Sequence, residues 1–201
     1  MKMRAMAGVA AAMGLASTAM AGVTPVAEFN GTLSEGFEAI SMPGGYPGPM
    51  SIFGGQATLV DTLANFHVIT FVWSGPAGDL LPYNGNLMGG CVAGSTLFTF
   101  ATPVAQFGGY LSTVGTQGGG TVIFRDVNGD EIDTLSLDIT PTQWTWNGWS
   151  STTPIGSIEV IGANIPMVST QFDDLQVTFV PAPGAGLLAG AGLIAAGRRR
   201  R

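Results

Sequence analysis

The chain has 201 residues, which is enough for one domain of ordinary size. It contains thirteen acidic and seven basic residues, and Arg125 is the only basic residue that lies away from the two ends. The interior therefore carries a formal charge of −12, against −6 for the whole chain, which excludes a typical nucleic-acid binder because such a surface repels phosphate. Cys91 is the only cysteine, so no disulfide forms within the chain.

The first 21 residues have the pattern of an export signal. Lys2 and Arg4 precede an apolar run over residues 5–15, and the small residues Ala19 and Ala21 flank Met20 in a signal-cleavage pattern. This order predicts a signal helix in residues 1–21, recognised by Sec-type export machinery and removed before Gly22. The alternative is a buried N-terminal helix. Such a helix would not require a basic start, an apolar run and a small-residue cleavage pattern to occur together.

Between the two ends the sequence predicts strand after strand. Val, Ile, Thr, Phe and Trp are enriched, and turn residues recur every eight to twelve positions. Because no amphipathic helix is evident, we predict an all-β fold over residues 22–179, an antiparallel β-sandwich of the jelly-roll kind. The expected strands cover residues 57–63, 66–73, 96–100, 104–113, 121–126, 131–138, 143–147, 155–161 and 172–179.

Two Gly- and Pro-rich stretches, residues 43–49 and 74–94, are expected to be surface loops.

Asn128-Gly129 predicts a tight two-residue hairpin turn, because this pair accepts positive φ angles. Oxygen-bearing side chains recur around it and imitate part of a calcium loop, at Asp126, Asn128, Asp130 and Glu131. An EF-hand loop lies between helices, so the hairpin is the better interpretation here.

Three tryptophans, Trp144, Trp146 and Trp149, are the candidates for sugar binding, since indole faces stack on sugar rings. Trp144 and Trp146 lie on one side of a strand by alternation. Packing in the core and an interface with another molecule are the alternatives, because an aromatic residue buries a large apolar area. Tyrosines beside Gly-rich segments are candidates to extend the same surface: Tyr46, Tyr83 and Tyr110.

The C-terminal residues 180–201 have the layout of a membrane-retention signal. Val180, Pro181, Pro183 and Gly184 form a Pro-containing motif, an apolar Gly- and Ala-rich run follows, and four arginines end the chain: Arg198, Arg199, Arg200 and Arg201. This order predicts a short transmembrane helix with a basic stop on the cytoplasmic side.

This tail resembles the sorting signal of PEP-CTERM proteins, which are exported bacterial proteins, with Ala182 where the family usually has Glu. The resemblance implies transient anchoring in the inner membrane and cleavage near the motif by an exosortase-like sorting protease. The product would then reach the cell surface or the extracellular matrix. An ordinary tail anchor that is never cut is the alternative.

Residues 102–179 resemble the jelly-roll, galactose-binding-like domains that often precede such tails. The resemblance is carried by residues 103–108, 121–129, 146–149, 154–158 and 172–177. It implies a noncatalytic envelope protein, and a structural calcium ion where the first and last strands meet, with Glu38, Asp173 and Asp174 as ligands. Hard carboxylate oxygens suit calcium. The alternative is that Asp173 and Asp174 only cap the start of a strand.

No catalytic constellation emerges from the sequence. His67, the only histidine, lies in an apolar strand, and both His67 and Cys91 are interpreted as structural. A structural or adhesive surface protein is therefore the first functional hypothesis, with possible binding of extracellular polysaccharide. A carbohydrate-binding module is the second, and a secreted glycan hydrolase with two carboxylates is the third.

Overall fold

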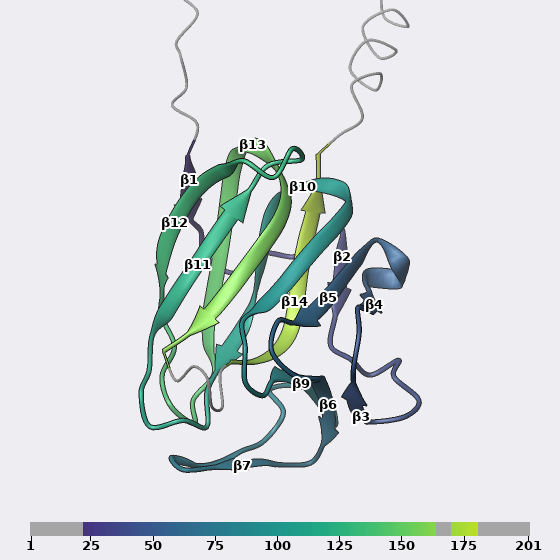
Figure 1. Ribbon diagram of the computed structural model, residues 1–201, viewed down its shortest axis with the longest axis vertical. Helices are drawn as coiled ribbons and strands as arrows, with labels where there is room; N and C mark the ends of the chain where they lie inside the picture. Colours follow the sequence, from purple (N-terminus) through teal and green to yellow (C-terminus); the bar gives the residue numbers. More distant parts are fainter. Residues whose placement is uncertain (1–21, 164–169, 181–201) are drawn as a thin grey trace, which may run out of the picture.

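The structure, a computed structural model, describes residues 22–163 and 170–180, which fold into an antiparallel β-sandwich (Figure 1). This confirms the predicted all-β, antiparallel sandwich. Its two layers are continuous, because two long strands, β10 (Thr96–Ser112) and β13 (Thr145–Gly162), bend and contribute one half to each layer.

The front layer faces the viewer in Figure 1. Here residues 96–99 of β10 and 157–160 of β13 pair with each other, and outer strands pair on both sides. The outer strands are β11 (Gly120–Arg125) and β12 (Glu131–Leu137) on one side, and β5 (Ala57–Asp61) and β4 (Met50–Ile52) on the other.

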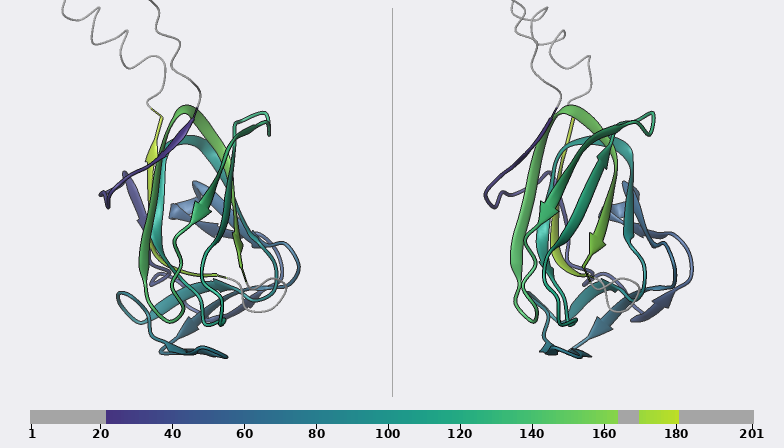
Figure 2. Two further views of the ribbon diagram at one scale, coloured as in Figure 1. Left: turned by 90° about the vertical axis from the view of Figure 1, so that its left-hand side faces the viewer. Right: turned by 60° about the vertical axis from the view of Figure 1, so that its left-hand side comes forward.

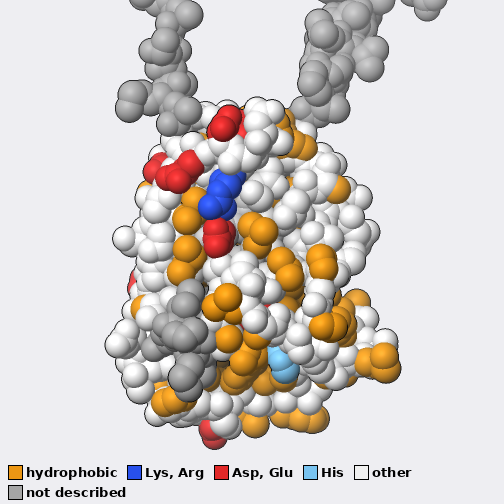
Figure 3. Space-filling model, viewed as in Figure 1, with side chains coloured by type: hydrophobic (Ala, Val, Ile, Leu, Met, Phe, Trp, Pro, Cys, Tyr) orange, Lys and Arg blue, Asp and Glu red, His pale blue; other side chains and the backbone are white. Residues whose placement is uncertain are grey.

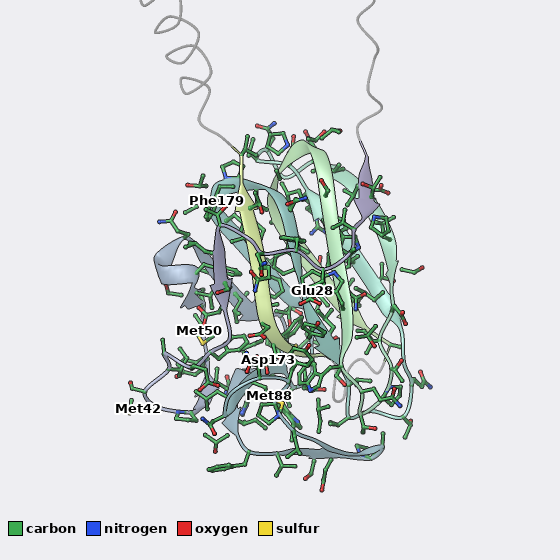
Figure 4. All side chains as sticks on the ribbon, turned by 180° about the vertical axis from the view of Figure 1, so that it is seen from behind. Glu28, Met42, Met50, Met88, Asp173 and Phe179 are labelled. Carbon is green, nitrogen blue, oxygen red and sulfur yellow. The ribbon has the colours of Figure 1, made fainter. Side chains whose placement is uncertain are left out.

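The back layer is built on the other halves of β10 and β13. β14 (Gln171–Phe179) pairs with β10, and β1 (Val23–Pro25) pairs with β13 at the opposite edge. β2 (Leu33–Glu35) pairs with β14. Residues 26–32 join β1 to β2 and cross the outside of this layer like a strap, as the view from behind shows (Figure 4).

The lower end of the molecule is formed by short strands that continue from β14. β9 (Leu87–Cys91) pairs with β14 and β6 (Phe66–Thr70), and β6 pairs with β3 (Gly44–Tyr46). A separate hairpin comprises β7 (Trp73–Gly75) and β8 (Gly78–Leu80), and a short 3-10 helix η1 (Phe53–Gly55) follows β4.

The core fills the space between the layers, which Figure 2 shows from the side. A chain of ring contacts runs through it: Phe98 contacts Phe107 and Phe172 at centroid distances of 5.1 and 5.5 Å, and Phe66 contacts Phe172 at 6.2 Å. All four rings are fully buried, and burying each contributes about 2 kcal/mol. A second, smaller cluster of Leu80, Met88 and Val114 lies at the lower end.

Several strand predictions differ from the structure in detail. The stretches 96–100 and 104–113, predicted as two strands, form the single bent strand β10, and 143–147 and 155–161 likewise merge in β13. Residues 74–94, predicted as a loop, contain β8 and β9. β9 is entirely buried although Gly89 and Gly90 weaken its strand signal.

The predicted hairpin between β11 and β12 forms, but its turn is longer than two residues. The amide of Asp126 donates to the carbonyl of Asp130, and only Gly129 of the Asn-Gly pair has positive φ, at +88°. The Asp126 carboxylate accepts the backbone N–H groups of Asn128 and Asp130, which makes this segment a turn stabilised by its own aspartate.

Within the residues that the structure describes, no helix is long and apolar enough to cross a membrane. The predicted signal helix and transmembrane helix lie in residues 1–21 and 181–201, outside the described ranges. The chain enters the described part at Gly22 and leaves it at Val180 at the same end of the sandwich (Figure 1).

Candidate functional site

Five aromatic side chains form a continuous row on the outside of the back layer, here called the aromatic row. Tyr110 of β10 and Trp146 of β13 are cross-strand neighbours, with centroids 5.4 Å apart. Tyr83, from the loop between β8 and β9, stacks on Tyr110 at 3.6 Å with an interplanar angle of 18°. Trp144 meets Tyr83 edge-on at 6.5 Å, and Phe29 of the strap meets Trp146 edge-on at 5.6 Å.

Trp146 is fixed between the sheet and the strap. A Cβ added to Gly108 or Gly148 would lie 2.7 or 2.6 Å from the indole, so the ring lies directly on two glycines. Its Nε1 donates a hydrogen bond of 3.2 Å to the carbonyl of Val26. Because Gly108 and Gly148 have no side chains, there is room for the Trp146 indole at this position.

Polar groups surround the stacked tyrosines. The Tyr110 hydroxyl donates to Oε2 of Glu28 at 2.7 Å, and Glu28 lies on the strap in front of the sheet (Figure 4). Burial, followed by hydrogen bonding with Tyr83 and Glu28, raises the pKa of Tyr110 above its ordinary value, so this hydroxyl stays protonated. Tyr83 is 44% exposed, so part of its ring is open to solvent in the stacked pair.

Two carboxylates hold the loop that carries Tyr83. Oδ2 of Asp173 accepts the backbone N–H groups of Tyr83 at 2.8 Å and Asn84 at 3.2 Å. Oε1 of Glu38 accepts those of Asn86 and Leu87, both at 2.7 Å. These four hydrogen bonds anchor the loop at both of its ends.

Asp173 is completely buried on β14, close to the aromatic row (Figure 4). Burial raises its pKa to about 7, although backbone N–H groups of Asn84, Asp174 and Tyr83 lower it, and the neighbouring charge of Asp174 raises it further. Asp174 has a strained backbone with φ of +45°, and its carboxylate accepts the side-chain amide of Asn84 at 3.2 Å.

The predicted calcium ligands Glu38, Asp173 and Asp174 are thus brought around one loop. The oxygens of Glu38 and Asp173 face N–H donors, however, and among the described residues no group of three or more His, Cys, Asp or Glu is placed to hold a metal. This donor set does not fit a calcium site in the arrangement shown. The carboxylates instead anchor the loop.

Trp149, the third predicted sugar-binding tryptophan, lies in the core and not on the surface. It is 3% exposed and stacks parallel to Phe107 at 6.2 Å. Because it is three positions from Trp146, alternation along β13 turns it to the inner face.

The sequence analysis did not identify Glu28 and Phe29 as residues of the site. The strap on which they lie has no strand pattern that would place it against the sheet.

The other predicted residues are accounted for within the fold. His67 lies half-buried on β6, edge-on to Trp73, and Sγ of the buried Cys91 donates to the carbonyl of Gly94. The amide of Val180 donates to the carbonyl of Pro103. The remaining residues of the cleavage pattern, sorting motif and basic stop lie outside the described ranges: Ala19, Ala21, Pro181, Pro183, Gly184 and Arg198–Arg201.

The front layer carries a groove of about 540 Å³ between the β11–β12 turn and the bend of β10. Asp126 is the one carboxylate in its described lining, and that side chain is bonded within its own turn. A glycosidase requires two carboxyl groups across the scissile bond. This groove does not present such a pair.

No model of a known protein family matches the chain, and no curated protein matches it. Among solved structures, it is similar to a family 6 carbohydrate-binding module from Clostridium cellulolyticum in complex with xylose, with 12% identity, a TM-score of 0.33, and coverage of 72% of this chain and 95% of that one. A family 11 carbohydrate-binding module from Clostridium thermocellum is 14% identical, with a TM-score of 0.31 and coverage of 77% and 97%.

An arabinose-bound α-L-arabinofuranosidase, MgGH51, is 17% identical with a TM-score of 0.39, over 72% of this chain and 26% of the enzyme. This chain therefore spans about a quarter of that protein's length. Identities and TM-scores of this size do not establish a shared family or activity.

Proposed function

We propose that the protein is an exported, noncatalytic cell-surface or matrix protein whose jelly-roll body binds neutral carbohydrate chains at the aromatic row. The observation that carries the proposal is the anchored, exposed ring of Tyr83, stacked on Tyr110 and bordered by Glu28 and Asn84.

This geometry suits sugar recognition for two reasons. The free face of Tyr83 offers a flat apolar surface for the C–H face of a pyranose ring. The Glu28 carboxylate, the tyrosine hydroxyls and the Asn84 amide offer acceptors and donors for sugar hydroxyls beside it. Few well-placed polar groups around an aromatic surface are typical of specific ligand sites.

The charge of the protein restricts the class of sugar. The described residues contain all thirteen acidic side chains and only one basic side chain, Arg125, which is paired with Glu159 at 3.0 Å on the front layer. Polyanionic glycans would be repelled from such a surface. Neutral polysaccharides are therefore the proposed ligands.

The sorting part of the proposal depends on the two ends of the sequence. An N-terminal signal and a PEP-CTERM-like tail would deliver the sandwich through Sec-type machinery to an exosortase-like protease. Because both ends of the described chain leave one end of the sandwich, a tail held in the membrane would leave the Tyr83 loop facing outward (Figure 1).

The proposal is tested with Tyr83→Ala, using Tyr46→Ala as the matched control, because Tyr46 is a partly buried tyrosine on β3, outside the aromatic row, and its hydroxyl donates to the carbonyl of Met42. The full-length protein in mild detergent is run through gels containing galactomannan, mixed-linkage β-glucan or arabinoxylan. We expect wild type and Tyr46→Ala to be retarded, and Tyr83→Ala to bind about tenfold more weakly. Absence of retardation, or equal retardation of all three, would overturn the proposal.

A further inference from the structure

We propose a second carbohydrate-binding surface, formed by Trp73, His67 and Asn65 at the lower end of the front side, which allows one molecule to bridge two neutral polysaccharide chains. This surface is here called the Trp73 surface. The inference rests on the proposed function, because it assigns the same ligand class to a separate place.

The Trp73 surface is built on a cross-strand row of unusually small residues. Gly45 of β3 is opposite His67 of β6, and His67 is opposite Gly90 of β9. The imidazole therefore has no side chain on either side within this row. The hollow over Gly90 is covered by Trp73, whose ring would lie 2.5 Å from a Cβ added there.

The position over Gly45 is occupied by side chains of the same surface. Gly45 is exposed, and the nearest atoms to a Cβ added to it belong to the His67 ring, at 3.1 Å, and the Asn65 side-chain amide, at 3.3 Å. An imidazole and an amide thus lie together over Gly45, beside an indole that meets His67 edge-on at 6.3 Å. Both groups form hydrogen bonds with hydroxyls.

Trp73 is held rigidly enough to act as a stacking surface. It packs against the buried cluster of Leu80, Met88 and Val114 but remains partly exposed. Two residues before it, Phe71 is 70% exposed and has positive φ, at +68°. Such a backbone costs about 1 kcal/mol for a non-glycine residue, and an aromatic ring held outward at that cost points to contact with a ligand.

The chemistry of the surface fits the same neutral sugars. Trp73, His67 and Asn65 include no carboxylate and no permanent positive charge, while the protein as a whole is strongly acidic. A ligand here must therefore be bound by stacking and neutral hydrogen bonds. An anionic polymer would be repelled by the rest of the molecule.

The two surfaces lie on opposite sides of the molecule. The one histidine of the chain is visible on the front side (Figure 3), whereas Glu28, beside the aromatic row, is seen from behind (Figure 4). Trp73 and Trp144 pack against the same small cluster, so its buried side chains separate the two surfaces. One protein molecule would thus cross-link two polysaccharide chains. Multivalent contact of this kind would strengthen the adhesion of the protein to the polysaccharide.

The test uses Gly45→Leu, whose side chain would displace the His67 ring and the Asn65 amide without removing any core side chain; Gly45 does not have positive φ. Full-length wild type, Gly45→Leu, Tyr83→Ala and the double variant are titrated with a neutral hexasaccharide from the polysaccharide that retards wild type. We expect a stoichiometry of two for wild type, one for each single variant and none for the double variant. Equal melting temperatures establish that each variant is folded.

A second readout measures cross-linking directly. Beads coated with the same polysaccharide are mixed with each protein, and wild type is expected to aggregate them while both single variants bind without aggregation. A wild-type stoichiometry of one, abolished by Tyr83→Ala alone, would overturn the second surface and leave the proposed function intact. Failure of wild type to bind any of the polysaccharides would overturn both.

Discussion

At the scale of single residues, side-chain direction along β13 decides which tryptophans are available to a ligand. Trp144 precedes β13 and contacts Tyr83, Trp146 lies in the same aromatic row, and alternation along β13 turns Trp149 into the core. The sequence alone did not show that Trp146 would be clamped by Val26 and Phe29, because these residues are distant in the chain. The exposed ring of the row is therefore Tyr83, which the sequence indicated only as a candidate extension.

Asp173 gives the fold a specific pH dependence. Its pKa is raised from 3.8 to about 7 in the folded protein, so between these values the unfolded chain is ionised while the folded protein keeps the proton. The stability contributed by this group is thus fully present below about pH 4 and is lost as the pH rises through 7. The groups that face it are Asp174, the backbone of Tyr83 and Asn84, and the loop held by Glu38.

This behaviour is measured by denaturant unfolding of wild type and Asp173→Asn at pH 5 and pH 8. Relative to the variant, wild type should lose about 2 kcal/mol of unfolding free energy between the two pH values. Both proteins contain all the other titrating groups, so the contributions of those groups to the pH dependence cancel in the comparison. A constant or growing advantage of wild type at pH 8 would mean that Asp173 is ionised in the folded state across this range.

At the scale of elements, the structure adds several short strands that the sequence did not indicate, among them β3 in the predicted loop of residues 43–49 and the buried β9, and one anchored loop. β9 contains two consecutive glycines and so resembles a loop, but Gly89 makes room for Phe37 and Phe66 on the core side and Gly90 for Trp73 on the other. Local propensity could not reveal this, because the requirement for glycine comes from rings that are contributed by other elements.

The anchored loop also bears on the calcium prediction. Since Glu38 and Asp173 bind backbone N–H groups, we expect the same melting temperature in 2 mM calcium and in chelator, with the loop held by hydrogen bonds alone. Magnesium serves as the ionic-strength control. A rise of several degrees that is specific to calcium would show that these carboxylates rearrange around the ion and would restore the sequence-based prediction.

At the scale of the whole molecule, the predicted sandwich is confirmed because it depends on many strands with consistent alternation, a signal that survives errors in individual boundaries. What the sequence could not provide is the path of the chain across the outside of the back layer. The strap brings Glu28 to a tyrosine 82 positions away, and no local pattern specifies such a contact. The sorting of the protein, in contrast, remains a prediction from its two ends.

The arrangement of the whole molecule suggests how binding and anchoring are combined. Chain entry and exit share one end of the sandwich, while the Tyr83 loop and the β7–β8 hairpin lie toward the other (Figure 1). A protein held by its tail would therefore present both of the proposed sugar-binding surfaces to its surroundings.

The central claim, that neutral sugar chains bind at the aromatic row, is tested most directly by an NMR titration of the full-length protein with a neutral hexasaccharide. The account predicts that the ring signals of Tyr83 and Tyr110 and the amide signal of Asn84 shift in a saturable manner. Shifts confined to the groove around Asp126, or saturation without any change at Tyr83, would contradict it.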